Sequence, residues 1–240
     1  METLNRDIIE KDYNKVKKEF QTKDNLLEAY NIANQMIGQE DVIKKVFTFL
    51  VFAFRGKLRN DKKTPLVFHS IYLTKMAYLC GEKNIDALLT TALHDVLEDT
   101  EINEESLMNE SLMTNKEYLI SHLKILSENK NLSREPNGEN LPPRYVEHIK
   151  RIIGAPKEVI NTEIIDRFSD LMDLEYITNL PEKEKQFRLK AKLIKVKSFV
   201  QNITQNRKDF NKNCSSLFES KVKDIEDRWK IKVDTPIIVP

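Results

Sequence analysis

The stretch IDALLTTALHDVLED, residues 85–99, decides the fold expected for this chain. At about 100° per residue it forms a helix with one aliphatic side, made of Ile85, Leu88, Leu89, Ala92, Leu93 and Val96. The opposite side has no lysine or arginine and carries Ala87, Thr90, Thr91, His94, Asp95 and Glu98. A solvent-facing side normally bears long charged side chains, so both sides are expected to pack against other parts of the protein.

The segments around this stretch also favour helices. Only 5 Gly and 8 Pro occur in 240 residues, so few positions interrupt a helical pattern. Helices are expected over residues 1–22, 23–37, 40–57, 66–80, 85–99, 143–153, 157–178 and from residue 182 onward, with one or two more within residues 103–127. Gly38 and Gly81 are expected to end two of them, and Pro65, Pro143 and Pro181 to begin others. Because no segment alternates apolar and polar residues, the chain is predicted to be all-α.

Composition excludes several classes of partner. The net charge is +1, from 39 basic and 38 acidic residues, which gives no overall field for a nucleic acid. No apolar run reaches the roughly 20 residues that span a bilayer, and the charged N-terminus is not a secretory signal. Cys80 and Cys214 lack metal-like spacing and are interpreted as reduced thiols. The sequence therefore predicts a soluble cytoplasmic protein without a nucleic-acid or membrane partner.

Three parts of the chain are distinguished. Residues 1–40 are predicted to form a helical extension, residues 41–205 the main domain, and residues 206–240 a helix and tail that ends in the extended-looking TPIIVP. The clearest loop is ENKNLSREPNGENL, residues 128–141. Whether a terminal part forms a dimer surface or binds a partner protein is left open by the sequence.

His94 and Asp95 predict a metal site. A buried carboxylate is costly unless it is paired or bound to metal, and imidazole with carboxylate suits Mn²⁺, Fe²⁺, Zn²⁺ or Mg²⁺. His69 in the preceding helix and Asp166 in the helix 157–178 are candidates for further ligands. The three acids of that later helix repel one another, which a cation would relieve: Asp166, Asp170 and Asp173.

Other polar residues receive simpler interpretations. Glu98 and Asp99 follow the His-Asp pair by about one turn, where carboxylates can orient or deprotonate a water. His122 and His148 are interpreted as partly exposed helical histidines. The Lys-rich run 183–197 is interpreted as a solvated helix face, with attraction of a polyphosphate substrate as the alternative.

Together, the order His69, His94-Asp95, Asp166 resembles the H…HD…D pattern of HD-domain phosphohydrolases, and more closely the hydrolase domain of RelA/SpoT-family proteins and their small stand-alone relatives. Four segments carry the resemblance over about residues 45–178: RGKLRNDKKTPLVFH (55–69), ALLTTALHDVLEDT (87–100), LKILSENKN (123–131) and EIIDRFSDLMDL (163–174). The resemblance implies an HD-domain helical bundle in residues 41–205, with no synthetase half after residue 178.

The resemblance also implies residue roles. The metal ligands, usually for Mn²⁺ with other divalent cations as alternatives, would be His69, His94, Asp95 and Asp166. Glu98 and Asp99 would hold or activate the attacking water, Arg59 would pack on the guanine base, and Lys130 would lie near the nucleotide. The implied reaction removes the 3′-pyrophosphate of guanosine 3′,5′-bis(diphosphate) (ppGpp), the alarmone of the stringent response, or of its pentaphosphate form pppGpp, giving GDP or GTP and pyrophosphate.

Two positions depart from the family pattern. Asp170 stands where the family normally has Asn, and Leu66 replaces the aromatic residue after the proline. A carboxylate at position 170 would repel a polyphosphate unless it is protonated, paired or metal-bound. Two alternatives to an alarmone hydrolase therefore stay open: an HD phosphohydrolase acting on another nucleotide or NADPH, and a catalytically silent nucleotide-binding HD module.

Overall fold

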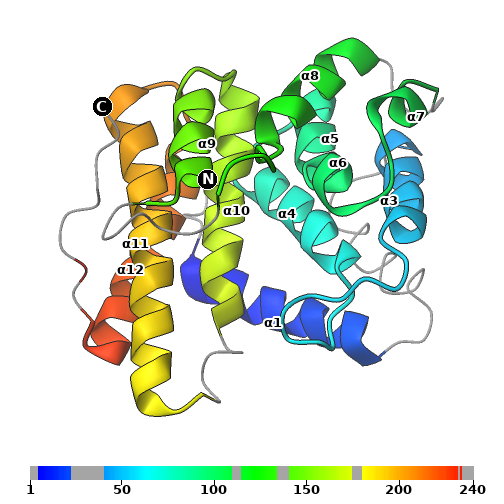
Figure 1. The fold of residues 1–240 in the computed structure, drawn as a ribbon. Coiled ribbons are helices and arrows are strands. Elements are labelled where there is room, and N and C mark those ends of the chain that lie inside the picture. The colour runs from blue at the N-terminus through cyan, green and yellow to red at the C-terminus, as the bar shows by residue number, and fades with distance from the viewer. Residues whose placement is uncertain are drawn as a thin grey trace. The chain divides into compact units, whose positions relative to one another are not determined.

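The structure is a computed structural model, and it describes residues 5–22, 41–109, 115–133, 141–174, 180–231 and 233 (Figure 1). None of these residues lies in a β-strand; the β-type pairing among them is an isolated bridge between Leu58 and Pro65. The prediction of an all-α protein is therefore confirmed. The helix expected over residues 23–37 with its stop at Gly38, and the tail 235–240, lie outside the described residues.

Contacts between residues divide the chain into two compact units, residues 1–127 and residues 128–240. Each unit has its own buried apolar side chains and is described by itself below. The three-part division predicted from the sequence, with limits at residues 40 and 205, stays a prediction.

The first unit is organised around one buried helix, α4. Its described helices are α1 (Arg6–Thr22), α3 (Asp41–Ala53), α4 (Val67–Leu79), α5 (Ile85–Leu93), α6 (Val96–Asp99), α7 (Glu104–Asn109) and α8 (Lys116–Leu126). Helix α4 contacts α1, α3 and α5, and α5 also contacts α3 and α8. Every residue from Val67 to Ala77 is buried, as expected of a helix that packs on all sides.

Local signals set the ends of α4 and α5. The carbonyl of Pro65 accepts the first helical hydrogen bond, from the backbone N–H of Phe68 at 3.1 Å. Gly81 follows α4 with φ = 101°, a left-handed conformation that glycine adopts without strain, as predicted for the stop. Asn84 then caps α5, because its side chain accepts the backbone N–H of Ala87 at 3.1 Å.

The expectation of a single helix over residues 85–99 was wrong. Helix α5 ends at Leu93, a turn holds His94 and Asp95, and α6 begins at Val96. The Asp95 carbonyl accepts the N–H groups of both Glu98 and Asp99, at 3.2 and 2.8 Å. The other expectation for this stretch, burial of its unusual polar side, is confirmed by Ala87, Thr90, Thr91 and His94.

The second unit contains α9 (Pro143–Ile153), α10 (Lys157–Met172), α11 (Glu182–Asn206) and α12 (Lys212–Trp229). Helix α10 contacts the other three, and α11 also contacts α9 and α12. Apolar side chains of α10 form part of the core of this unit: Val159, Ile160, Ile164, Phe168, Leu171 and Met172. Pro143 and Pro181 stand at the starts of α9 and α11, as the sequence predicted.

Two further features bear on the sequence predictions. No helix among the described residues is long and apolar enough to cross a membrane. Cys80, at the end of α4, and Cys214, in α12, are both buried and neither forms a disulfide. Each compact unit thus contains one buried thiol.

Candidate metal centre

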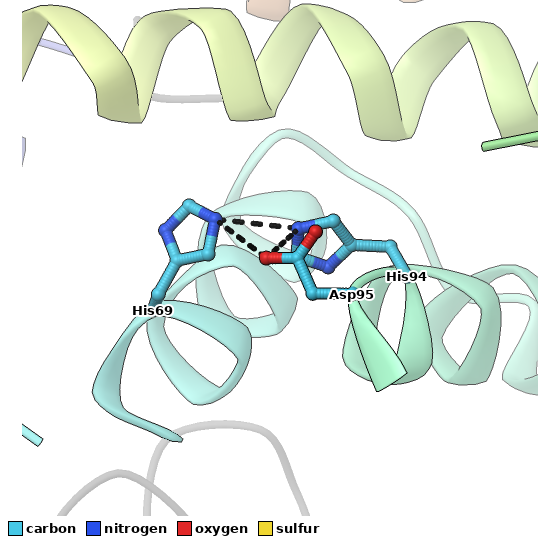
Figure 2. Close-up of side chains that lie close together, drawn as sticks. All are labelled: His69, His94 and Asp95. Carbon is cyan, nitrogen blue, oxygen red and sulfur yellow. Dashed lines mark hydrogen bonds and ion pairs between the residues drawn. The ribbon is translucent and has the colours of Figure 1, made fainter. Parts of the chain in front are cut away.

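Three predicted ligands converge in the first unit (Figure 2). His69 projects from the first turn of α4, while His94 and Asp95 lie in the turn between α5 and α6. The Nε2 atoms of the two histidines are 3.3 Å apart, and Asp95 Oδ2 lies 3.0 Å from His94 Nε2 and 3.5 Å from His69 Nε2. Both histidines are only 5% exposed. These three atoms therefore face a common point in a largely buried place.

The orientation of the His94 ring is fixed by a contact of its Nδ1 atom, on the side away from the cluster. Its Nδ1 lies 2.8 Å from the carbonyl oxygen of Thr91. A carbonyl only accepts hydrogen bonds, so Nδ1 carries the proton and Nε2 presents its lone pair to the cluster. A backbone acceptor behind the imidazole is the usual support of a metal-ligating histidine.

The three side chains fit a divalent cation. Two ligand atoms that are each about 2.1 Å from one ion lie about 3.0 Å apart at an octahedral angle and about 3.4 Å apart at a tetrahedral one. The three separations here run from 3.0 to 3.5 Å. Two imidazoles with one carboxylate suit Mn²⁺, Fe²⁺ or Zn²⁺, and a set of three leaves coordination positions for further ligands.

Glu98 and Asp99 follow the ligands on α6. Burial and the charge of Asp95 raise the pKa of Asp99, against the opposing charges of His94, Lys57 and His69. The ammonium of Lys57 also donates a hydrogen bond to the Asp99 backbone carbonyl. Asp99 is therefore a carboxylate whose affinity for a proton is increased, which suits a general base.

The basic loop before α4 is a closed turn. The backbone N–H of Leu66 donates to the Lys57 carbonyl at 2.9 Å, and that of Arg59 donates to the Thr64 carbonyl at 2.8 Å. Asp61 accepts the N–H groups of Lys63 and Thr64 at 2.9 and 2.8 Å. Arg59, the predicted base-packing residue, is partly buried within this turn. Lys57 was not singled out in the sequence, where it is one of several basic loop residues.

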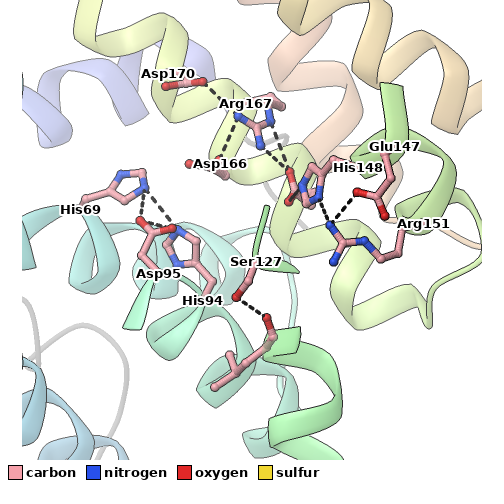
Figure 3. A network of polar contacts seen from close by, with 12 residues as sticks. His69, His94, Asp95, Ser127, Glu147, His148, Arg151, Asp166, Arg167 and Asp170 are labelled. Carbon is pink, nitrogen blue, oxygen red and sulfur yellow. Dashed lines mark hydrogen bonds and ion pairs between the residues drawn. The ribbon is translucent and has the colours of Figure 1, made fainter. Parts of the chain in front are cut away.

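Two other predicted residues, Asp166 and Asp170, meet in the second unit around Arg167 (Figure 3). The Nη1 atom of Arg167 is 3.3 Å from an oxygen of each aspartate. Asp170 also pairs with Lys192 of α11 at 2.7 Å. The positive charge of Arg167 therefore offsets the repulsion between Asp166 and Asp170 on α10. Sequence reasoning missed this role of Arg167. Asp170 stands where the family pattern has Asn, and its carboxylate was expected to repel a polyphosphate unless paired. In the structure it is paired with two cations, Arg167 and Lys192.

The interpretation of His148 as a partly exposed histidine was wrong. It is fully buried, and its Nε2 lies 2.7 Å from Glu163 Oε1. The other oxygen of Glu163 accepts from Arg167 Nη2 at 2.8 Å. Burial alone would raise the pKa of Glu163, but the charges of Arg167 and His148 lower it. This chain of contacts leads from His148 through Glu163 and Arg167 to Asp166.

His122 was also misjudged, since it is buried rather than partly exposed. Its Nδ1 lies 3.3 Å from the Thr90 hydroxyl, and its ring centroid is 4.0 Å from that of Tyr118.

Lys130 is exposed, and its backbone carbonyl accepts a hydrogen bond from Arg144 at 2.6 Å. Glu163 and Arg167 are four residues apart on one helix, and this spacing is the sequence signal that could have revealed their pairing.

Comparisons with known proteins agree with the predicted fold. No family model matches the chain. A GTP pyrophosphokinase of Myxococcus xanthus is 26% identical over 156 residues, which is 62% of this chain and 19% of that relative. The chain therefore spans about a fifth of the length of this curated relative.

A solved structure described as a metazoan ortholog of SpoT, which hydrolyzes ppGpp and plays a role in starvation responses, has a similar fold. The TM-score is 0.61 at 20% identity, and the match covers 80% of this chain and 97% of that chain. The predicted helical bundle is therefore confirmed at the level of the fold, which is similar to the fold of this SpoT ortholog.

Proposed function

We propose that this chain is a metal-dependent phosphohydrolase that removes the 3′-pyrophosphate of ppGpp or pppGpp. The observation that carries the proposal is the convergence of His69 Nε2, His94 Nε2 and Asp95 Oδ2 beside Asp99, a carboxylate of raised pKa. The described function of the metazoan SpoT ortholog, to hydrolyze ppGpp, supports the choice of substrate. A cytoplasmic location, and a nucleotide rather than a nucleic acid as the partner, belong to the same proposal.

The proposed metal is Mn²⁺, held by His69, His94 and Asp95, with Asp166 as a fourth ligand. The support for Asp166 is the order of the H…HD…D motif in the sequence. When bound, a divalent cation supplies Lewis-acid stabilisation of charge on the phosphoryl oxygens. His94 contributes a lone pair whose direction is set by its hydrogen bond to Thr91.

The remaining roles fall to protein side chains. Glu98 and Asp99 hold the attacking water, and one of these carboxylates accepts its proton. Arg59 packs its guanidinium on the guanine base, which a planar cation does well. Lys130 attracts the phosphates, and Asp170 lies at the edge of the substrate site with its charge paired by Arg167 and Lys192.

The test is release of pyrophosphate and GDP from ppGpp by the purified chain, with Mn²⁺ and with EDTA, followed by anion-exchange chromatography. We expect release that requires Mn²⁺ and stops in EDTA. The Asp95→Asn variant should bind no Mn²⁺ and show no turnover, while Glu101→Gln, an exposed acid nearby, serves as the charge-matched control. Full turnover in EDTA, or normal turnover by Asp95→Asn, would exclude the proposed centre.

A second candidate is hydrolysis of another nucleotide or of NADPH, and the observations that favour it are Asp170 and Leu66 at positions where the family pattern differs. A substrate panel distinguishes the two, because a preferred substrate without a 3′-pyrophosphate would replace the first proposal. Tight nucleotide binding without turnover of any substrate in the panel would instead indicate a silent binding module.

A further inference from the structure

The lysines of α11 fall into distinct groups. Lys185 pairs with Glu182 at 2.9 Å and Lys197 with Glu226 at 2.7 Å, whereas Lys190 is exposed. Lys192 pairs with Asp170 of α10. Lys195 rests on the ring of Tyr145 in α9, with its Nζ 4.3 Å from the ring centroid. The solvated face predicted for the whole Lys-rich run therefore does not extend to Lys192 and Lys195.

Lys195 is unusual among these cations. Within the described part of the chain its ammonium forms no ion pair with a carboxylate and lies over the aromatic ring of Tyr145. Burial, together with the charges of Arg167 and Lys192, lowers the pKa of Lys195 to about 8. A desolvated ammonium has three donors and is costly to keep without acceptors, so the position favours a bound anion.

The neighbouring charges do not supply that anion. The guanidinium of Arg167 already bonds Glu163, Asp166 and Asp170. Asp170 is shared between Arg167 and Lys192, and Glu128 is paired with Arg144 at 3.9 Å. The carboxylates near this cluster are therefore engaged elsewhere, whereas Lys195 keeps its donors.

We propose that Lys195 and Lys192 form an anion-binding site for a phosphate or pyrophosphate group, in which Lys195 is the main donor and Asp170 holds Lys192 in place. An ammonium group is a compact point charge, and lysine commonly binds phosphate in this way. That this group is the pyrophosphate of the substrate or product rests on the proposed function; the anion site itself does not.

The test is calorimetric titration of the full chain with inorganic pyrophosphate in EDTA. Lys195→Met keeps most of the aliphatic stem and removes a partly buried charge, so it is expected to fold, with circular dichroism as the check. Affinity for pyrophosphate should fall roughly tenfold or more, the size expected for a lost charge-assisted contact. The matched control Lys190→Met, on the exposed side of the same helix, should change affinity by less than about twofold.

A second readout does not depend on variants. Lys195 should be acylated early by an amine reagent near pH 8, because its pKa of about 8 leaves much of it unprotonated there. Pyrophosphate should protect Lys195 in the peptide map and leave Lys190 unprotected. Equal pyrophosphate affinity in wild type and Lys195→Met, or no protection of Lys195, overturns the site.

The two proposals fail separately. Lys195-dependent pyrophosphate binding without ppGpp hydrolysis keeps the anion site and removes the proposed function. Mn²⁺-dependent hydrolysis with unchanged KM and unchanged pyrophosphate affinity in Lys195→Met keeps the function and removes the anion site. If wild type binds no pyrophosphate in EDTA, the titration is repeated with Mn²⁺, and absence of a Lys195 effect there also overturns the site.

Discussion

At the scale of single residues, Lys57 joins two parts of the candidate centre. Its ammonium donates to the backbone carbonyl of Asp99, and its own carbonyl accepts the N–H of Leu66, three residues before His69. One residue thus holds the turn that carries Asp99 and the loop that leads into the first ligand. Its role follows from backbone contacts, which no pattern of basic residues in a loop reveals.

Lys57→Met should reduce kcat by about tenfold with little change in KM, because small displacements of a catalytic group reduce rate more than binding. Lys63→Met, an exposed lysine of the same loop, is the control. Steady-state kinetics with ppGpp measures both. A rise in KM with unchanged kcat would instead make Lys57 a substrate contact.

The carboxyl group of Asp61 is expected to make the stability of the fold depend on pH. Burial alone would raise the pKa of its carboxyl, but hydrogen bonds from Thr64 and Lys63 and the charge of Lys17 lower it well below its usual range. A carboxyl with a depressed pKa stabilises the fold above its unfolded pKa, near 3.9, and this stabilisation is lost as the pH falls further. Asp61→Asn should therefore lower the free energy of unfolding by about 1–2 kcal/mol at pH 7.

Urea denaturation of wild type and Asp61→Asn at pH 7 and pH 3 measures this difference. We expect the gap between the two proteins to narrow at pH 3, where the wild-type carboxyl begins to lose its advantage. A gap that stays constant with pH would show that the side-chain amide, rather than the missing charge, causes the loss.

At the scale of elements, α1 is anchored to α4 by a buried polar cluster. Asp12 of α1 accepts hydrogen bonds from the Tyr72 hydroxyl at 2.8 Å and from the Lys75 ammonium, and Lys75 is fully buried. The Tyr13 ring packs on Phe68 and Tyr72, with centroids 5.1 and 4.9 Å apart. Phe68 directly precedes His69, so α1 supports the start of the helix that carries the first ligand.

Asp12→Leu should destabilise the chain by about 3–5 kcal/mol, because it leaves the Lys75 ammonium buried without its partner. The double variant Asp12→Leu/Lys75→Met should recover much of that loss, since both polar groups are then gone. Urea denaturation of wild type, Asp12→Leu, Lys75→Met and the double variant measures the loss in the single variant and its recovery in the double variant. A single variant within about 1 kcal/mol of wild type would mean that water reaches Lys75.

Helix ends marked by a proline or a glycine were predicted well, whereas the ends expected at residues 57 and 178 were not: α3 ends at Ala53 and α10 at Met172. Pro65, Gly81 and Pro181 act locally, so the ends that they set were predicted correctly. The interruption at His94 and Asp95 was missed, because a two-residue turn hardly changes helical periodicity. The expected all-α class was correct, and His69, His94 and Asp95 lie close together, while their role as metal ligands with Asp166 stays a prediction.

Burial of polar residues was predicted less well, for a physical reason. His148 and Glu163 are fifteen positions apart on different helices, and their pairing depends on how α9 packs with α10. The acids of α10 were expected to be relieved by a cation, and Arg167, on the same helix, lies 3.3 Å from both Asp166 and Asp170. A sequence shows that charge must be balanced without showing which neighbour balances it.

At the scale of the whole molecule, metal binding should be linked to stability. A ligand that binds only the folded state at 100 times its Kd adds about 2.7 kcal/mol to the free energy of unfolding. Mn²⁺ should therefore raise the melting temperature of the full chain, and Asp95→Asn should abolish the shift. Differential scanning calorimetry with increasing Mn²⁺ measures it.

Asp166→Asn extends the same experiment to the second unit. We expect Mn²⁺ affinity to fall at least about tenfold if Asp166 is a ligand. Glu158→Gln, on the first turn of the same helix, is the control. An unchanged affinity would remove Asp166 from the ligand set and leave His69, His94 and Asp95 as the proposed site.

The two buried cysteines give the molecule a built-in pair of reporters. Cys80 lies in the first compact unit and Cys214 in the second. A thiol reagent reaches a buried cysteine when the surrounding structure opens, so the alkylation rate of each one follows the opening of its own unit. Unequal rates would mean that one unit opens without the other. A time course of alkylation followed by mass spectrometry therefore compares the opening of the two units in the unmodified chain.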